Sequence, residues 1–335
     1  MSDNQKSLTD RKTRASDSQL RRKGKKRLGV GGLKGNWPLY IMFLPGIFLA
    51  LMFNYLPMFG IIIAFKKINL KDGIFSSPWV GWDNFAMLLR NANAWVSIRN
   101  TVLYNAVFIF TGLVLAVALA IVLSMLKNKL VSKIYQTVYI MPYFLSMVIV
   151  SYLVFAFLNM ESGFINNSVL PALTGGSADK INWYAQSKAW PYILWIVRTW
   201  KMVGYESIVY LATIAGIDSE MYEAAKIDGA NLWKQVRYIT IPSIKTLMII
   251  MTILNVGGIF TADFGLFYNV PMNSGALYPT TLVINTYVYN MMTAAGSAST
   301  GLASSASMLQ SVLGFVLVLT TNAIVRKIDR DSALF

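Results

Sequence analysis

Long runs of apolar residues alternate with polar connections along almost the whole chain. Each run has about the twenty residues that a helix needs to cross a bilayer. The pattern predicts an all-α membrane protein with six transmembrane helices, and Asn100 is the expected N-cap of the second. The six predicted spans lie near residues 38–65, 101–126, 137–158, 191–217, 243–264 and 308–325.

Basic residues are concentrated in the first 36 residues, which hold eleven Lys and Arg against three Asp. Such a segment directly before a span is typical of a cytoplasmic retention signal, and it is also able to touch anionic lipid. We therefore expect a disordered basic cytoplasmic tail at 1–36 and a six-span domain at 37–335. A regulatory or lipid-specific role of the tail stays open.

The remaining Lys and Arg residues indicate how the spans are oriented. Together with the tail, the connections on one side of the expected membrane carry 21 of them, whereas the connections on the other side carry seven. Because basic residues are retained in the cytoplasm, both termini and the connection at 217–242 are predicted to be cytoplasmic.

Composition excludes several classes of function. The chain is 55% hydrophobic and 13% charged, with a mean hydropathy of +0.50, as in a membrane protein. It has no cysteine and no histidine, which excludes a thiolate or histidine metal site and a histidine general base. The sequence contains no Walker-type phosphate loop. The net charge of +15 resides largely in the tail, so no nucleic-acid partner is expected.

The polar connection at 217–242 predicts a helix–turn–helix elbow. Asp218 or Ser219 is placed to cap its first helix, and Gly229 is suited to the left-handed turn that ends it. Pro242 then opens the next apolar run, where its missing N–H costs nothing.

Within this elbow the sequence resembles the permease subunits of binding-protein-dependent ABC importers. The fuller run from Tyr222 to Gly229 is similar to the carbohydrate-uptake branch, and the segment from 262 to 289 resembles permeases for complex oligosaccharides and polysaccharide fragments. The matching positions are Glu223, Ala224, Ala225, Gly229, Ile239 and Pro242, with Ile241 where the family has leucine.

The resemblance implies a type I ABC importer permease fold in a bacterial cytoplasmic membrane. It implies a non-catalytic subunit that binds no cofactor and moves a sugar oligomer. ATP and Mg²⁺ would be held by two ATPase subunits, and the other partners would be a second permease subunit, usually in a heterodimer, and an external solute-binding protein. The residues expected to couple to the ATPases are Tyr222, Glu223, Ala224, Ala225, Asp228 and Gly229.

Ionisable side chains inside or beside the apolar runs are costly unless they face a partner or a wet cavity. Arg198 and Lys201 share a helix face in the fourth run, with Glu206 off that face. A polar translocation path and a structural ion pair at a subunit interface are both open. The candidate path residues are Arg198, Lys201, Tyr205, Glu206, Asn255, Asp263, Tyr268, Gln310 and Asn322.

The external segment 269–307 contains no charged residue. In related permeases the corresponding loop faces the binding protein, and a flexible connector is the alternative. A different function also remains open, namely a stand-alone secondary transporter of a small polar solute, or a channel. That class predicts inverted repeats and a buried carboxylate for ion coupling, and no repeat is obvious here.

Overall fold

The computed structural model describes residues 37–69, 73–126, 128–176, 179–293 and 297–328, so the expected tail at 1–36 lies outside the described residues. Within them the chain forms helices and turns, with one isolated antiparallel bridge between Lys66 and Trp79. The chain divides into two units, Met1–Gly60 and Ile61–Phe335, and each is considered by itself.

The described part of the first unit is one apolar helical run. It consists of α3 (Trp37–Ala50), a π-turn (Leu51–Tyr55) and the start of a 3₁₀ helix (Leu56–Phe65) that continues into the second unit. Residues Tyr40–Phe65 are long and apolar enough to cross a membrane, in agreement with the first predicted span. The helix changes from α to π and then to 3₁₀ between Pro45 and Pro57. A proline lacks the N–H of the regular α-helical hydrogen bond, so it favours such a change.

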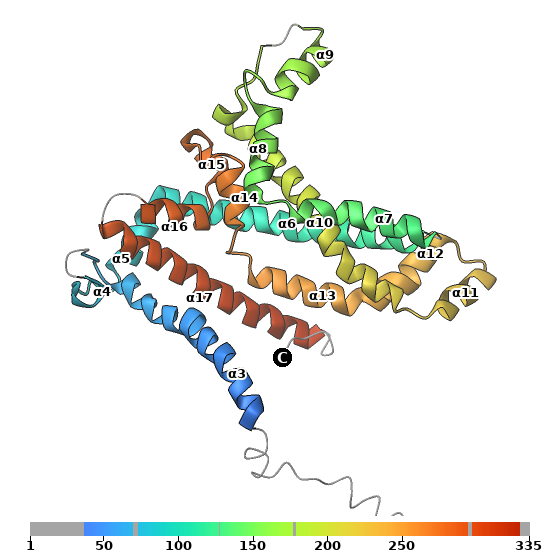
Figure 1. Ribbon diagram of the computed structural model, residues 1–335, viewed down its shortest axis with the longest axis horizontal. Coiled ribbons are helices and arrows are strands. Elements are labelled where there is room, and N and C mark those ends of the chain that lie inside the picture. The colour runs from blue at the N-terminus through green and yellow to red at the C-terminus, as the bar shows by residue number, and fades with distance from the viewer. Residues whose placement is uncertain (1–36, 70–72, 127, 177–178, 294–296, 329–335) are drawn as a thin grey trace, which may run out of the picture. The chain divides into compact units, whose positions relative to one another are not determined.

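The second unit is built around α6, α10 and α13, which pack against one another, while α17 packs along α13 (Figure 1). Close approach of α13 and α17 depends on glycine, because a Cβ at Gly314 would lie 3.2 Å from the Gly257 carbonyl oxygen. The α-helices of this unit are α4 (Gly73–Ser76), α5 (Asp83–Arg90), α6 (Ala92–Ser124), α7 (Lys129–Ile140), α8 (Met147–Leu158), α9 (Leu170–Thr174), α10 (Trp190–Ala215), α11 (Ser219–Ile227), α12 (Leu232–Gln235), α13 (Ile241–Gly257), α14 (Phe264–Asn269), α15 (Tyr278–Thr281), α16 (Ile284–Thr293) and α17 (Ser297–Ile328).

Helix α6 starts earlier than the sequence predicted. Its N-cap is Asn91, whose side chain accepts a hydrogen bond from Asn93 N, and the expected cap Asn100 lies inside the helix. The buried Asn100 amide donates instead to the carbonyl oxygens of Pro279 and Leu282, at 3.3 and 3.0 Å. The Asn100 side chain therefore bonds to a segment remote in sequence instead of capping the start of its own helix.

The third predicted span is broken. Helix α7 passes into a 3₁₀ turn (Met141–Phe144), and α8 then leaves at 94°. Pro142 lies in the turn, and Ser146 caps α8 by accepting a hydrogen bond from Val148 N. The run predicted as the third span is therefore a bent pair of helices and not one continuous helix. The run is apolar throughout, so only the proline hints at the break.

Four described helical stretches are long and apolar enough to cross a membrane, and the bent pair α7–α8 is a fifth candidate. Helix α10 is also 26 residues long, but it carries three charged side chains within little more than two turns. The fifth predicted span ends at Gly257, well before residue 264, and α17 begins at Ser297, so the sixth starts earlier than predicted.

The segment between α13 and α17 is folded, as far as the structure describes it. Its apolar side chains pack with α8 and α10, and the fully buried ones include Leu266, Val270, Leu277 and Val283. Residues 297–307 belong to α17. A flexible connector over 269–307 is therefore incorrect for the described residues, because their apolar side chains form part of the core.

Candidate functional site

A cavity of about 350 Å³ lies between α6, α10, α13 and the turn after α13. Four of the predicted path residues line it, namely Arg198, Glu206, Asn255 and Asp263. The other lining residues are Asn105, Phe108, Ile109, Gly112, Leu113, Met202, Leu254, Gly258 and Thr261.

An ion pair lies on the α10 wall of the cavity. Arg198 Nη2 donates to Glu206 Oε1 at 2.9 Å, and the two side chains are 21% and 24% exposed. The guanidinium also lies 5.1 Å from the centre of the Phe108 ring. On α6, Gly112 leaves room for the carboxylate, because a Cβ there would lie 2.9 Å from Glu206 Oε2.

Lys201 does not join this pair, although it lies one turn from Arg198. Its ammonium donates to the carbonyl oxygens of Pro142, Tyr143 and Leu145, at the break between α7 and α8, and Lys201 is 7% exposed. The break interrupts the helical hydrogen bonding here, with Pro142 O accepting also from Leu145 N at 3.2 Å, and the end of a helix favours a positive charge. Lys201 therefore holds the bend rather than facing the cavity.

The part of the cavity near Asp263 is lined by paired polar groups. Asn105 Nδ2 donates to the carbonyl oxygens of Ile259 and Thr261 at 2.7 and 3.1 Å, and Asp263 Oδ1 accepts from Leu266 N at 3.1 Å. These bonds compensate carbonyl and amide groups left free where α13 ends and α14 begins. Asn105 was not among the predicted path residues, although it is an amide inside an apolar run, as Asn255 is.

The other five predicted path residues do not line this cavity. Besides Lys201, Tyr205 stacks on Tyr143 with ring centres 4.1 Å apart, and Tyr268 packs against Phe264 and Tyr289. Asn322 is buried in α17. Gln310 donates to Thr261 Oγ1 at 2.9 Å, beside the cavity but outside its lining.

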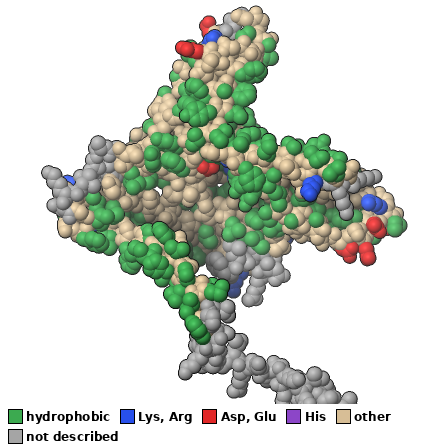
Figure 2. All heavy atoms as spheres, viewed as in Figure 1, with side chains coloured by type: hydrophobic (Ala, Val, Ile, Leu, Met, Phe, Trp, Pro, Cys, Tyr) green, Lys and Arg blue, Asp and Glu red, His purple; other side chains and the backbone are tan. Residues whose placement is uncertain are grey.

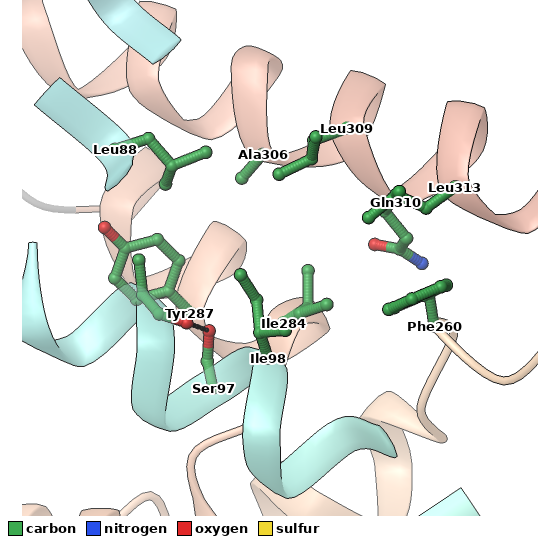
Figure 3. A pocket seen from close by; sticks show the side chains of 11 residues that line it. Leu88, Ser97, Ile98, Phe260, Ile284, Tyr287, Ala306, Leu309, Gln310 and Leu313 are labelled. Carbon is green, nitrogen blue, oxygen red and sulfur yellow. Dashed lines mark hydrogen bonds between the residues drawn. The ribbon is translucent and has the colours of Figure 1, made fainter. Parts of the chain in front are cut away.

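Gln310 instead borders a second, very small space between α5, α6, α16 and α17 (Figure 3). Its volume is about 10 Å³, and its lining is mostly apolar, including Leu88, Ile284 and Tyr287. A water molecule needs about that much volume and several polar partners, so this space is a packing gap rather than a ligand site.

The elbow has the predicted form. Asp218 caps α11 by accepting from Glu220 N at 3.0 Å, and Gly229 has a φ of +75°. Asn231 caps α12, which runs through a π-turn (Val236–Thr240) into α13. The Tyr222 hydroxyl is 2.9 Å from Thr240 Oγ1, which joins the two arms of the elbow.

The predicted coupling residues differ in exposure. Glu223, Ala224, Asp228 and Gly229 are exposed, whereas Tyr222 and Ala225 are half-buried. Acidic and basic side chains lie together at the end of the second unit that carries α11 (Figure 2). Apolar side chains are exposed beside them, and Ile227 is 86% exposed. Residues of the elbow also line a cavity of about 1150 Å³.

Comparisons with known proteins agree with this architecture. Residues 109–331 match the family described as binding-protein-dependent transport system inner membrane component. Protein LplB of Bacillus subtilis is 29% identical over 94% of this chain and 96% of its own length. The polygalacturonan/rhamnogalacturonan transport system permease protein YteP of the same organism is 30% identical, over 88% of this chain and 89% of its own length. Over 89% of this chain and 98% of the other, the fold matches a chain of a bacterial ABC transporter that imports the acidic polysaccharide alginate, with a TM-score of 0.80 and 31% identity.

Fold, elbow and sequence thus define a permease of the type I ABC importer class. The chain belongs to the family of inner membrane components of binding-protein-dependent transport systems. It is the non-catalytic membrane subunit of such a system.

Proposed function

We propose that this permease forms half of the membrane channel of a sugar-oligomer importer in a bacterial cytoplasmic membrane. The support comes from relatives whose names refer to polygalacturonan and rhamnogalacturonan or to lactose, and from the fold shared with the alginate importer. In this proposal the apolar runs form six spans, and the distribution of Lys and Arg favours both termini in the cytoplasm.

The cavity between α6, α10 and α13 is the observation that carries this proposal. It combines amide, hydroxyl, carboxylate and guanidinium groups with the apolar side chains of Phe108 and Met202. A sugar needs hydrogen-bonding groups for its hydroxyls and an apolar surface for its ring face. Replacing Asn255 by leucine is therefore expected to slow uptake while the complex still assembles and hydrolyses ATP.

The elbow is proposed to dock on an ATPase subunit that holds ATP and Mg²⁺. Closure of two ATPases would draw the elbows of this chain and of a second permease together and reorient the spans. In this arrangement the exposed Ala224 lies at the interface. Ala224→Trp should abolish co-purification with the ATPase subunits, whereas the matched Ala224→Ser variant should retain it.

The folded segment 258–293 is proposed to lie on the external side and to receive the solute-binding protein. The natural lack of cysteine makes the orientation easy to test. A single cysteine at Ile227 in the elbow should react with an impermeant thiol reagent only from the cytoplasm. A cysteine at Leu173, which is 79% exposed in α9, should react only from outside.

The decisive experiment is uptake of labelled oligosaccharide into proteoliposomes. Uptake should require this chain, its partner permease, the ATPases with ATP and the binding protein together. Uptake by this chain alone, driven by an ion gradient, would instead establish the secondary-transporter alternative.

A further inference from the structure

The charged groups around the cavity show which kind of sugar unit it suits. Among its lining residues only Arg198, Glu206 and Asp263 are ionisable at neutral pH, and none of the lining residues from α6 or α13 is charged. The second cation of α10, Lys201, is turned away into the carbonyl oxygens at the α7–α8 break. The lining therefore contributes one positive and two negative side chains.

The one cation that lines the cavity is already occupied. Arg198 Nη2 is 2.9 Å from Glu206 Oε1, and Phe108 lies beside the guanidinium. A sugar carboxylate that approached the guanidinium would either take the place of Glu206 at Nη2 or lie beside the Glu206 carboxylate at the other N–H groups. Both arrangements bring two carboxylates together in a partly buried space, and such a like-charge contact is costly.

We propose that this cavity accepts uncharged sugar units and discriminates against uronates, and that Glu206 sets the preference by occupying Arg198. The inference rests on the proposed function, since it concerns the substrate of the same path. Neutral hydroxyls are able to use Asn255 and Thr261 without breaking the ion pair, and Met202 and Leu254 add apolar surface to the lining. Glu206 thus acts as a built-in competitor of any substrate carboxylate.

The test measures how tightly two sugar tetramers bind to the whole permease–ATPase complex in nanodiscs. The binding protein is left out, so that its own specificity does not affect the measured affinities. The two probes are an α-1,4-linked tetragalacturonate and the same tetramer with its carboxyl groups reduced to hydroxymethyl groups. Saturation-transfer NMR titrations of both probes give their dissociation constants. We expect the wild-type complex to bind the reduced tetramer about tenfold more tightly, the scale of one unfavourable charge contact.

Two variants isolate the role of Glu206. Glu206→Gln frees Arg198 and should bring the two affinities within about threefold, because a substrate carboxylate then finds an unpaired guanidinium. Glu206→Asp keeps the negative charge and should retain the discrimination. Co-purification with the ATPase subunits reports whether each variant is assembled.

A salt titration of the wild-type complex tests the same point without mutation. Repulsion is screened by salt, so tetragalacturonate should bind more tightly as ionic strength rises, while binding of the reduced tetramer stays constant. The inference would be overturned if the wild-type complex bound tetragalacturonate as tightly as the reduced tetramer or more tightly. It would also be overturned if added salt weakened the binding of tetragalacturonate. Neither result would contradict the proposed function as a sugar importer. Binding of neither tetramer would refute the inference together with the proposed sugar substrate.

Discussion

Replacement of Lys201 by methionine gives the sharpest test of how the broken third span is held. Methionine keeps most of the side-chain length and removes the ammonium that donates to the carbonyl oxygens of Pro142, Tyr143 and Leu145. The site is nearly closed to solvent, since Lys201 is 7% exposed. Water would therefore not readily replace the lost donor.

The size of the effect follows from the carbonyl groups of Tyr143 and Leu145, because the Pro142 carbonyl keeps its hydrogen bond from Leu145 N at 3.2 Å. A buried polar group without a partner costs about 1–3 kcal/mol, and relaxation of the turn will compensate part of that cost. We expect Lys201→Met to destabilise the protein by about 3 kcal/mol, which is roughly 5 °C or more in the melting temperature. The Tyr143–Tyr205 stack lies beside the same turn and should loosen with it.

Thermal unfolding of the purified complex in detergent measures the shift. Lys180→Met is the matched control, because the exposed Lys180 also donates to a carbonyl oxygen, that of Glu161 at 3.1 Å. Its loss should change stability by less than about 0.5 kcal/mol. A Lys201→Met complex that melts within the error of the wild type would show that the ammonium does not hold the bend.

Three further substitutions test individual features. Gly229→Ala places a side chain at a φ of +75° in open space, so backbone strain alone should cost about 1–2 kcal/mol and weaken binding of the ATPase subunits in a pull-down. Gly229→Asn should retain more of that binding, because asparagine tolerates a positive φ better than alanine. Gly204→Ala would drive a Cβ into the Tyr139 carbonyl where α10 crosses α7, so the yield of folded protein in size-exclusion chromatography should fall sharply. Gly216→Ala is the control and should express normally, because the nearest atom to its Cβ would lie at 3.4 Å. The buried Tyr287 hydroxyl has no hydrogen-bond partner among the described residues, so Tyr287→Phe should leave the melting temperature unchanged or raise it.

The elbow is the part of the protein that the sequence alone determined most fully. Asp218, Asn231 and Gly229 act on backbone groups within three residues of themselves, so their caps and turn were predictable without knowledge of any other element. The apolar runs determined in the same way that the chain forms long membrane-compatible helices. Their ends were less predictable, because α13 ends at Gly257, a boundary that the apolar pattern does not contain.

The arrangement of the charged side chains was decided only by the tertiary structure. Spacing along α10 left open whether Glu206 pairs at all, and it placed Arg198 and Lys201 on one face. In the fold Gly112 of α6 leaves room for Glu206, while the broken turn at Pro142 offers carbonyls that draw Lys201 away. These partners are remote in sequence, and desolvated charges pair with whatever complementary group packing brings within reach. The same packing folds the segment 258–293 against α8 and α10, and Gly258, Thr261 and Asp263 of this segment line the cavity.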